Sequence, residues 1–276
     1  MNKNYSILFF ALLIFCLPIR AGNENEPLGA RSAGMQHASL CLSDVWAAQN
    51  NQSSLAFLKQ SAGSFYCANH FGFSEFNTTA LALVIPMEAS AWSLCAVSSG
   101  NALYQSDKAG LAYARRFGNS FAAAAQLDFL SIRIGEGYGS RNTAAAELSF
   151  RIRIIPSLHF GAHLFNPTRT MLSVQPGEQI ATVLRAGLLY ECSRKIRIAF
   201  ETEKDNFNPP LFRAGFEYQP AENIFIRAGA CHPAFFSFGA GMQIRNLRMD
   251  FSSAWHPVLG YSPTLALTIF LGKKHT

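Results

Sequence analysis

The chain has 276 residues, of which 49% are hydrophobic and only 14% are charged, and its formal net charge is +6. Ordinary globular chains carry about 25% charged residues, so this composition favours a protein that turns an apolar face toward lipid. The basic residues are dispersed singly along the chain and do not cluster, which argues against a nucleic-acid-binding protein.

Residues 1–21 are typical of a cleavable secretory signal peptide. Lys3 supplies the positive start, an apolar run covers Ile7 to Leu17, and cleavage is expected after Ala21. This run is too short to cross a bilayer as a helix, and no later stretch is long and apolar enough to do so. We therefore expect an exported protein that crosses a membrane, if it does, with strands.

Residues 22–62 do not show the alternation of a strand array. They mix small and amide residues with scattered apolar ones, and Ser43-Asp44 is placed to cap a short helix over Val45 to Ala48. Two arrangements fit this composition equally well. The segment either covers one end of the following domain as a helix or lies inside it as a plug.

From residue 63 to residue 276 the pattern predicts one transmembrane antiparallel β-barrel of about fourteen strands. In the stretch from Phe235 to Ile244, apolar residues alternate with small or polar ones, which is the period of a strand. Segments of this kind, near ten residues long and joined by turns, are typical of outer-membrane barrels. The expected strands are 64–71, 77–86, 89–98, 108–117, 119–133, 142–154, 157–166, 179–192, 196–203, 210–219, 223–231, 235–244, 247–255 and 263–272.

The connections alternate in length, which supports the same architecture. Short turns are expected at 86–88, 118–119, 155–157, 193–195, 220–222 and 245–246, and longer loops mostly fall between them. Outer-membrane barrels have short turns on the periplasmic side and longer loops outside. An even number of strands then places both ends of the barrel domain on the periplasmic side.

Charged residues occupy one face of the predicted strands. Facing lipid near the midplane would cost a charged side chain about 2–4 kcal/mol, so the apolar face should meet lipid and the charged face the lumen. Opposite charges on neighbouring strands can pair there, which predicts a polar lumen that is narrow or plugged. The candidates for lumen-facing residues are Glu147, Arg151, Arg153, His159, His163, Arg185, Arg213, Glu217, Arg227, Arg248 and Asp250.

Six runs of residues resemble a known group of proteins. They are similar to corresponding runs in the PorV/PorQ-like outer-membrane proteins of Bacteroidetes, within the wider superfamily of FadL-type barrels. The runs are Leu28 to Met35, Ala38 to Leu40, Ser43 to Ala48, Gly110 to Gly118, Gly135 to Ser140 and Phe165 to Pro167. The resemblance implies a fourteen-stranded barrel with the N-terminal segment packed into or under it. It also implies either uptake of hydrophobic molecules, as in FadL-type members, or service to the type IX secretion apparatus, as in PorV-like members.

The residues predict no catalytic centre, cofactor site or metal site. His159 and His163 share a strand face but lie four residues apart, roughly 13 Å at 3.3 Å per residue, so they cannot hold one metal by themselves. We therefore expect an outer-membrane barrel that is not an enzyme. Its expected partners are outer-membrane lipid and a small hydrophobic solute. The alternatives are a non-transporting scaffold or secretion accessory, whose partners would be secretion proteins, and a soluble exported β-sandwich, which would expose too many apolar side chains to water.

Overall fold

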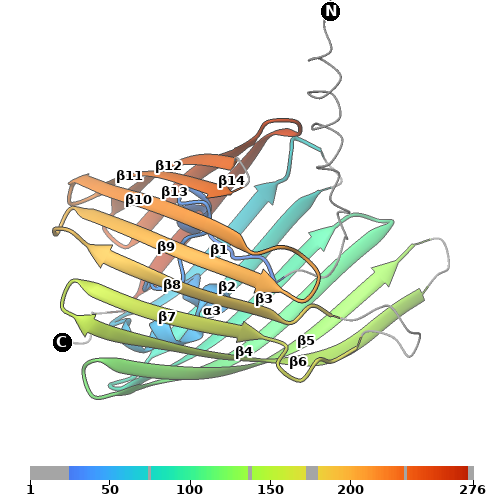
Figure 1. Cartoon of the computed structure of the whole chain (residues 1–276), viewed down its shortest axis with the longest axis horizontal. Helices are drawn as coiled ribbons and strands as arrows, with labels where there is room; N and C mark the ends of the chain where they lie inside the picture. The colour runs from blue at the N-terminus through green and yellow to red at the C-terminus, as the bar shows by residue number, and fades with distance from the viewer. Residues whose placement is uncertain (1–24, 74–75, 136–138, 172–179, 233–234, 273–276) are drawn as a thin grey trace, which may run out of the picture.

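The computed structural model describes residues 25–73, 76–135, 139–171, 180–232 and 235–272, and in them the chain forms a closed barrel (Figure 1). Each of its fourteen described strands pairs antiparallel with its neighbours in sequence, and the first pairs with the last. The expected all-β antiparallel barrel of about fourteen strands is confirmed. The predicted signal peptide, residues 1–21, lies outside the described residues.

Three short helices precede the strands: α2 (Ala30–Ala33), α3 (Ala47–Asn50) and the 3₁₀ helix η2 (Gln52–Phe57). The strands are β1 (Ser61–Asn69), β2 (Asn77–Pro86), β3 (Ser90–Gly100), β4 (Tyr104–Phe117), β5 (Phe121–Ile134), β6 (Gly139–Ile155), β7 (Leu158–Phe165), β8 (Val183–Glu191), β9 (Ile196–Asp205), β10 (Leu211–Ala221), β11 (Ile224–His232), β12 (Phe235–Ile244), β13 (Leu247–His256) and β14 (Gly260–Leu271).

Alternation of side chains decides which face of each strand turns inward. In β2, Ala80 and Ala82 are buried while Leu81 and Leu83 are exposed on the outer surface. Successive side chains of a strand point to opposite faces, so small residues fill the interior and large apolar ones form the outer belt. The same alternation repeats around the barrel and gives it the outer surface that a lipid bilayer requires.

The expected two-residue turn at Arg245-Asn246 joins β12 to β13, where Ile244 pairs with Leu247. At the opposite end the strands run further than the sequence predicts. The expected loop 99–107 shrinks to residues 101–103, because the β3–β4 ladder continues to the pair Gly100–Gln105. The polar residues there suggest a loop by composition, but ladder hydrogen bonds join backbone groups and tolerate polar side chains.

Residues 25–60 lie within the ring of strands, as the blue segment in Figure 1 shows. Helix α2 contacts β12, β13 and β14, whereas η2 contacts β3 to β6 on the other side. The short helix expected at residues 45–48 is found at Ala47–Asn50, and Asp44 accepts a hydrogen bond from the Trp46 amide at 3.0 Å. Within the described part of the chain, none of the helices has the length and hydropathy of a membrane-spanning helix.

Candidate functional site

The inner wall of the barrel has an apolar half and a polar half. The apolar half is built largely from alanines of β1 to β5 and β14, and it packs against Leu28, Trp46 and Leu55 of the N-terminal segment. Alanine side chains leave room for these large residues, so the two sets form one core. The wall residues of this core are Ala62, Tyr66, Ala68, Ala80, Ala82, Val84, Ala91, Cys95, Ala114, Ala122, Ala124 and Ala266.

The polar half carries most of the lumen-facing candidates. Those buried in the wall are Glu147, Arg151, His159, His163, Arg185, Glu217, Arg227 and Asp250, with exposed fractions of 7% or less. The side chains of Arg213 and Arg248 retain 9% and 12% exposure. Arg153 is exposed, because it lies near the end of β6 beside the turn to β7. The lumen therefore holds a dense layer of charge next to the N-terminal segment.

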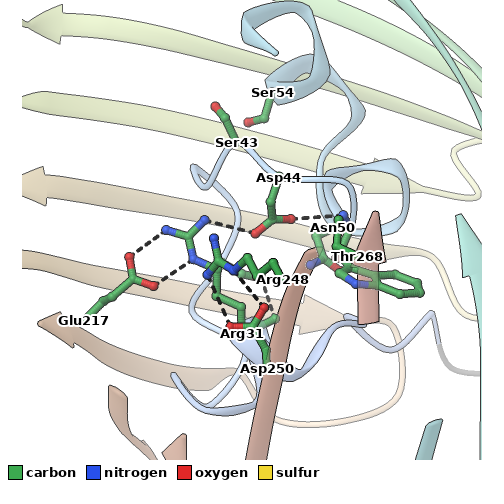
Figure 2. A network of polar contacts seen from close by, with 12 residues as sticks. Arg31, Ser43, Asp44, Asn50, Ser54, Glu217, Arg248, Asp250 and Thr268 are labelled. Carbon is green, nitrogen blue, oxygen red and sulfur yellow. Dashed lines mark hydrogen bonds and ion pairs between the residues drawn. The ribbon is translucent and has the colours of Figure 1, made fainter. Parts of the chain in front are cut away.

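One cluster of charges is centred on Glu217. Arg31 of α2 donates two hydrogen bonds to this carboxylate, at 2.7 and 2.8 Å, and a third to Asp44 at 3.1 Å (Figure 2). Arg197 and Arg227 approach the same carboxylate from the wall at 3.0 and 2.8 Å. This paired geometry is the strongest kind of charge-assisted contact, and it fixes α2 to strand β10.

The Glu217 cluster extends along the wall through Asp250. Arg227 contacts Asp250 at 2.8 Å, and Arg248 contacts the same carboxylate at 2.8 Å. Figure 2 shows Arg248 and Asp250 next to the Arg31 side chain. The pairing accounts for four of the predicted lumen-facing residues, Glu217, Arg227, Arg248 and Asp250, which the structure brings together.

A second cluster is centred on Glu147 in β6. Lys108 contacts one carboxylate oxygen at 2.5 Å and His163 contacts the other at 2.7 Å. From the N-terminal segment, Gln52 donates to Glu147 at 2.5 Å and Asn25 donates to it at 3.3 Å. The carboxylate thus joins three wall strands to both ends of the inner segment.

Several buried charged residues of the lumen were not among the candidates predicted from the sequence. Lys108 and Asp128 lie 3.6 Å apart and face inward. The alternation of side chains along β4 and β5 indicates the inward position of both residues. Glu201 accepts the backbone amides of Ser39 and Leu40, each at 3.0 Å. Arg31 gave no signal, because it lies in a segment without periodicity.

Two groups of the inner segment are uncharged near neutral pH. Burial, with Arg213 and His70 nearby, lowers the pKa of His37 to about 3. Burial raises the pKa of the Cys41 thiol to about 12. In this region the segment therefore presents its charge through Arg31 and Asp44, both of which are paired.

Several glycines of the barrel wall lie directly against the inner segment and allow its close approach. A Cβ atom at Gly215 would lie 2.7 Å from Cβ of Met35, and one at Gly239 would lie 3.1 Å from the Cα of Gly34. Real Cβ contacts are essentially never shorter than 3 Å, so a side chain at Gly215 would displace the segment. The glycines in contact with residues 34–41 are Gly161, Gly187, Gly215, Gly229 and Gly239.

Above the segment, at the loop end of the barrel, lies a cavity of about 400 Å³. Its apolar lining comes from Leu28, Phe71, Phe76, Val97, Tyr104, Leu130 and Phe165. Two of its lining residues are charged: Lys108, whose ammonium is paired with Glu147 and lies 5.2 Å from the Phe165 ring centroid, and Glu26, which lies 3.9 Å from His70. The charge of Lys108 is thus neutralised by a carboxylate of the wall.

Below the segment, at the end with the short turns, a second cavity of about 570 Å³ is polar. The segment contributes Arg31, Cys41, Leu42 and Ser43 to its lining, and the wall contributes mostly charged and amide side chains. The wall residues are Arg151, Leu189, Glu191, Arg197, Gln219, Glu222, Asn223, Phe225, Gln243, Arg245 and Arg248. The two cavities thus differ in character, since the upper one is lined mainly by apolar surface and the lower one by polar surface.

No model of a protein family matches the sequence, and comparison with curated proteins gives no match. Solved structures of similar fold include the CymD monoaromatic hydrocarbon channel, at 14% identity, with a TM-score of 0.67 over 92% of this chain and 100% of that one. The toluene transporter TodX of P. putida is 9% identical, with a TM-score of 0.68 over 91% of this chain and 100% of that one.

A FadL homologue from Pseudomonas aeruginosa is 12% identical, with a TM-score of 0.62 over 90% of this chain and 99% of that one. Identities this low carry information on the fold and not on a shared substrate. The agreement covers nine-tenths of the chain, including its closed ring of strands. The chain has the barrel fold of the FadL-type channels.

Proposed function

We propose that this protein is an outer-membrane channel for small, uncharged hydrophobic solutes, with residues 25–60 as a plug in its lumen. The cavity at the loop end carries the proposal, because apolar side chains supply most of its lining surface and the Lys108 ammonium in it is paired with Glu147. An uncharged apolar solute gains free energy on entering such a cavity, at about 25 cal/mol for each Å² of apolar surface buried. A charged solute would lose much of its hydration there, and the Lys108 ammonium is already paired with Glu147.

The plug is supported by the contacts of the segment with both halves of the wall. Its apolar side chains pack on the alanines, while Arg31 and the amides of Ser39 and Leu40 bind buried carboxylates. A segment held on both sides separates the upper cavity from the lower one.

Location in the outer membrane is supported by the belt of exposed apolar residues on the outer surface, which includes Leu81, Leu127, Phe129 and Phe238. The predicted signal peptide, residues 1–21, would direct the chain across the inner membrane. The names of CymD and TodX describe channels for monoaromatic hydrocarbons, so these compounds are the first solutes to test.

The test is uptake of a labelled monoaromatic hydrocarbon by bacterial cells with an intact outer membrane that produce the protein. Val97 lines the upper cavity, and Val97→Asp should reduce the uptake rate by about tenfold or more, because a carboxylate there must lose its hydration or stay protonated. Val258→Asp makes the same change at a side chain that is 83% exposed outside the cavity and should leave uptake unchanged.

Uptake no faster than in cells without the protein would contradict the transport proposal. If the protein then co-purified with other envelope proteins, the scaffold or secretion-accessory alternative would replace it. Equal loss of uptake in the two valine variants would instead show that the cavity is not the solute site.

A further inference from the structure

We propose that the lower cavity contains a binding site for a small oxyanion, a phosphate or a carboxylate, centred on Arg151. Five arginines line this cavity among the described residues: Arg31, Arg151, Arg197, Arg245 and Arg248. The inference concerns the end of the barrel opposite the apolar cavity and does not depend on transport.

Three of these arginines are already neutralised by carboxylates. Arg31 pairs with Glu217 and Asp44, and Arg197 pairs with Glu191 and Glu217. Arg248 pairs with Asp250 at 2.8 Å. None of the three therefore needs a further anion.

Arg245 and Glu222 lie at the rim of the cavity, in the turns between β12 and β13 and between β10 and β11. Both residues are exposed, so water screens their charges. They lie on neighbouring turns, since the Gln243 amide donates to the Asn223 carbonyl at 2.9 Å. The rim thus carries one charge of each sign and leaves the interior unbalanced.

Arg151 differs from the other four arginines. It is only 7% exposed, and in the described part of the chain it forms no ion pair with a carboxylate. One guanidinium nitrogen donates to the Ser43 hydroxyl, and the guanidinium lies 4.8 Å from the Phe57 ring centroid. Its Nε atom has no hydrogen-bond partner, although it is buried.

A buried guanidinium without a counter-charge is costly, because neither a hydroxyl nor an aromatic face replaces an anion. The lining carboxylate of β8, Glu191, is held by Arg197 at 3.2 Å and approached by His159 at 3.7 Å. An oxyanion in the cavity would supply the missing counter-charge to the Arg151 guanidinium and accept the hydroxyl proton of Ser43. Phosphate and carboxylate fit, since both match the planar fork of guanidinium donors.

The site joins the wall to the inner segment, because Arg151 belongs to β6 and Ser43 follows Leu42 in the segment. A bound anion should therefore raise the stability of the complete, plugged barrel. The stabilisation grows with the ratio of free anion to its dissociation constant.

The experiment measures thermal unfolding and calorimetric binding of the complete chain in non-ionic detergent, with sodium phosphate, sodium acetate or sodium chloride at constant ionic strength. We expect saturable binding and a raised midpoint with phosphate, acetate or both, relative to chloride. The two oxyanion arms separate a phosphoryl ligand from a carboxylate ligand.

Arg151→Gln should weaken the binding by about tenfold or more, because it removes the charged donor. Arg153→Gln, two residues along the same strand but exposed, is the matched control and should bind as the unaltered chain does. Arg151→Lys retains the positive charge and serves as the test variant if Arg151→Gln fails to fold. It should bind the oxyanion more weakly than Arg153→Gln does.

Absence of saturable binding of both oxyanions to the unaltered chain would overturn the proposal. Unchanged affinity in Arg151→Gln and Arg151→Lys would overturn it as well. Loss of hydrocarbon uptake with retained phosphate or acetate binding would contradict the channel and leave the anion site standing.

Discussion

Three arginine side chains converge on the single buried carboxylate of Glu217. Arg31 comes from the inner segment, Arg197 from β9 and Arg227 from β11, all within 3.0 Å. The carboxylate itself is fully buried. The ionised form is stabilised by these charge-assisted hydrogen bonds, and the arginines in turn depend on the carboxylate for compensation of their own charge.

Replacing Glu217 by glutamine should therefore destabilise the folded protein strongly. The change leaves buried arginines without their shared counter-charge, and breaking one partner of a buried ion pair costs about 3–5 kcal/mol. The midpoint of heat-induced unfolding, followed by gel mobility, measures the effect. Glu222→Gln, at an exposed turn, should leave the midpoint unchanged, and equal midpoints for the two variants would show that the cluster does not stabilise the fold.

At the scale of elements, the N-terminal segment packs closely against glycine positions in the strands of the polar wall. Gly215 and Gly229 are paired across β10 and β11, and both face Met35. A glycine in a strand interior weakens the strand, and such positions commonly mark close approach of another backbone. Here the approaching backbone is that of the inner segment. The two glycines lower the β-propensity of their strands but leave the room that this backbone needs.

Valine at Gly215 should displace the segment while leaving the barrel intact. The new Cβ would meet Met35 at 2.7 Å, whereas the strand ladder gains a residue of high β-propensity. We expect ion conductance in planar bilayers that the unaltered chain lacks. Gly63→Val, where the nearest atoms lie 3.9 Å from the added Cβ, is the control and should not conduct. A closed Gly215→Val channel would contradict the plug.

The molecule as a whole has two unlike ends. Ser61 at the start of β1 pairs with Leu271 at the end of β14, and the next residue, Ala62, pairs with Val84 close to the short β2–β3 turn, so the first and last strands begin and end at the short-turn side. The apolar cavity opens at the other end, near Phe71 and Phe76. If the protein lies in the outer membrane as we propose, the short turns face the periplasm and the apolar cavity faces outward.

Labelling with a membrane-impermeant maleimide tests this orientation in whole cells. In a background with Cys192→Ser and Cys231→Ser, Val258→Cys should react in intact cells, because Val258 lies in the loop between β13 and β14. Glu88→Cys, in the turn between β2 and β3, should react only after the outer membrane is permeabilised. Labelling of Glu88→Cys alone in intact cells would reverse the orientation.

Local patterns in the sequence are enough to predict the all-β barrel architecture of this protein. The alternation in stretches such as Phe235 to Ile244 gave the strands, because the period of two is a local property of extended backbone. The cost of charge in lipid predicts that residues such as Glu147 and Arg185 turn away from the outer surface, and both side chains are buried. Strand ends were less well determined, since a ladder can extend into polar residues, as at Gly100 and Gln105.

The pairing of the buried charges, in contrast, depends on the closed three-dimensional arrangement of the strands. Arg31 and Glu217 are 186 positions apart and lie on elements whose distance depends on closure of the whole barrel. The position of residues 25–60 inside the ring was likewise open, because their composition fits a helix at the barrel end as well as a segment in the lumen. Such contacts arise from the global register of fourteen strands, and local sequence patterns do not encode that register.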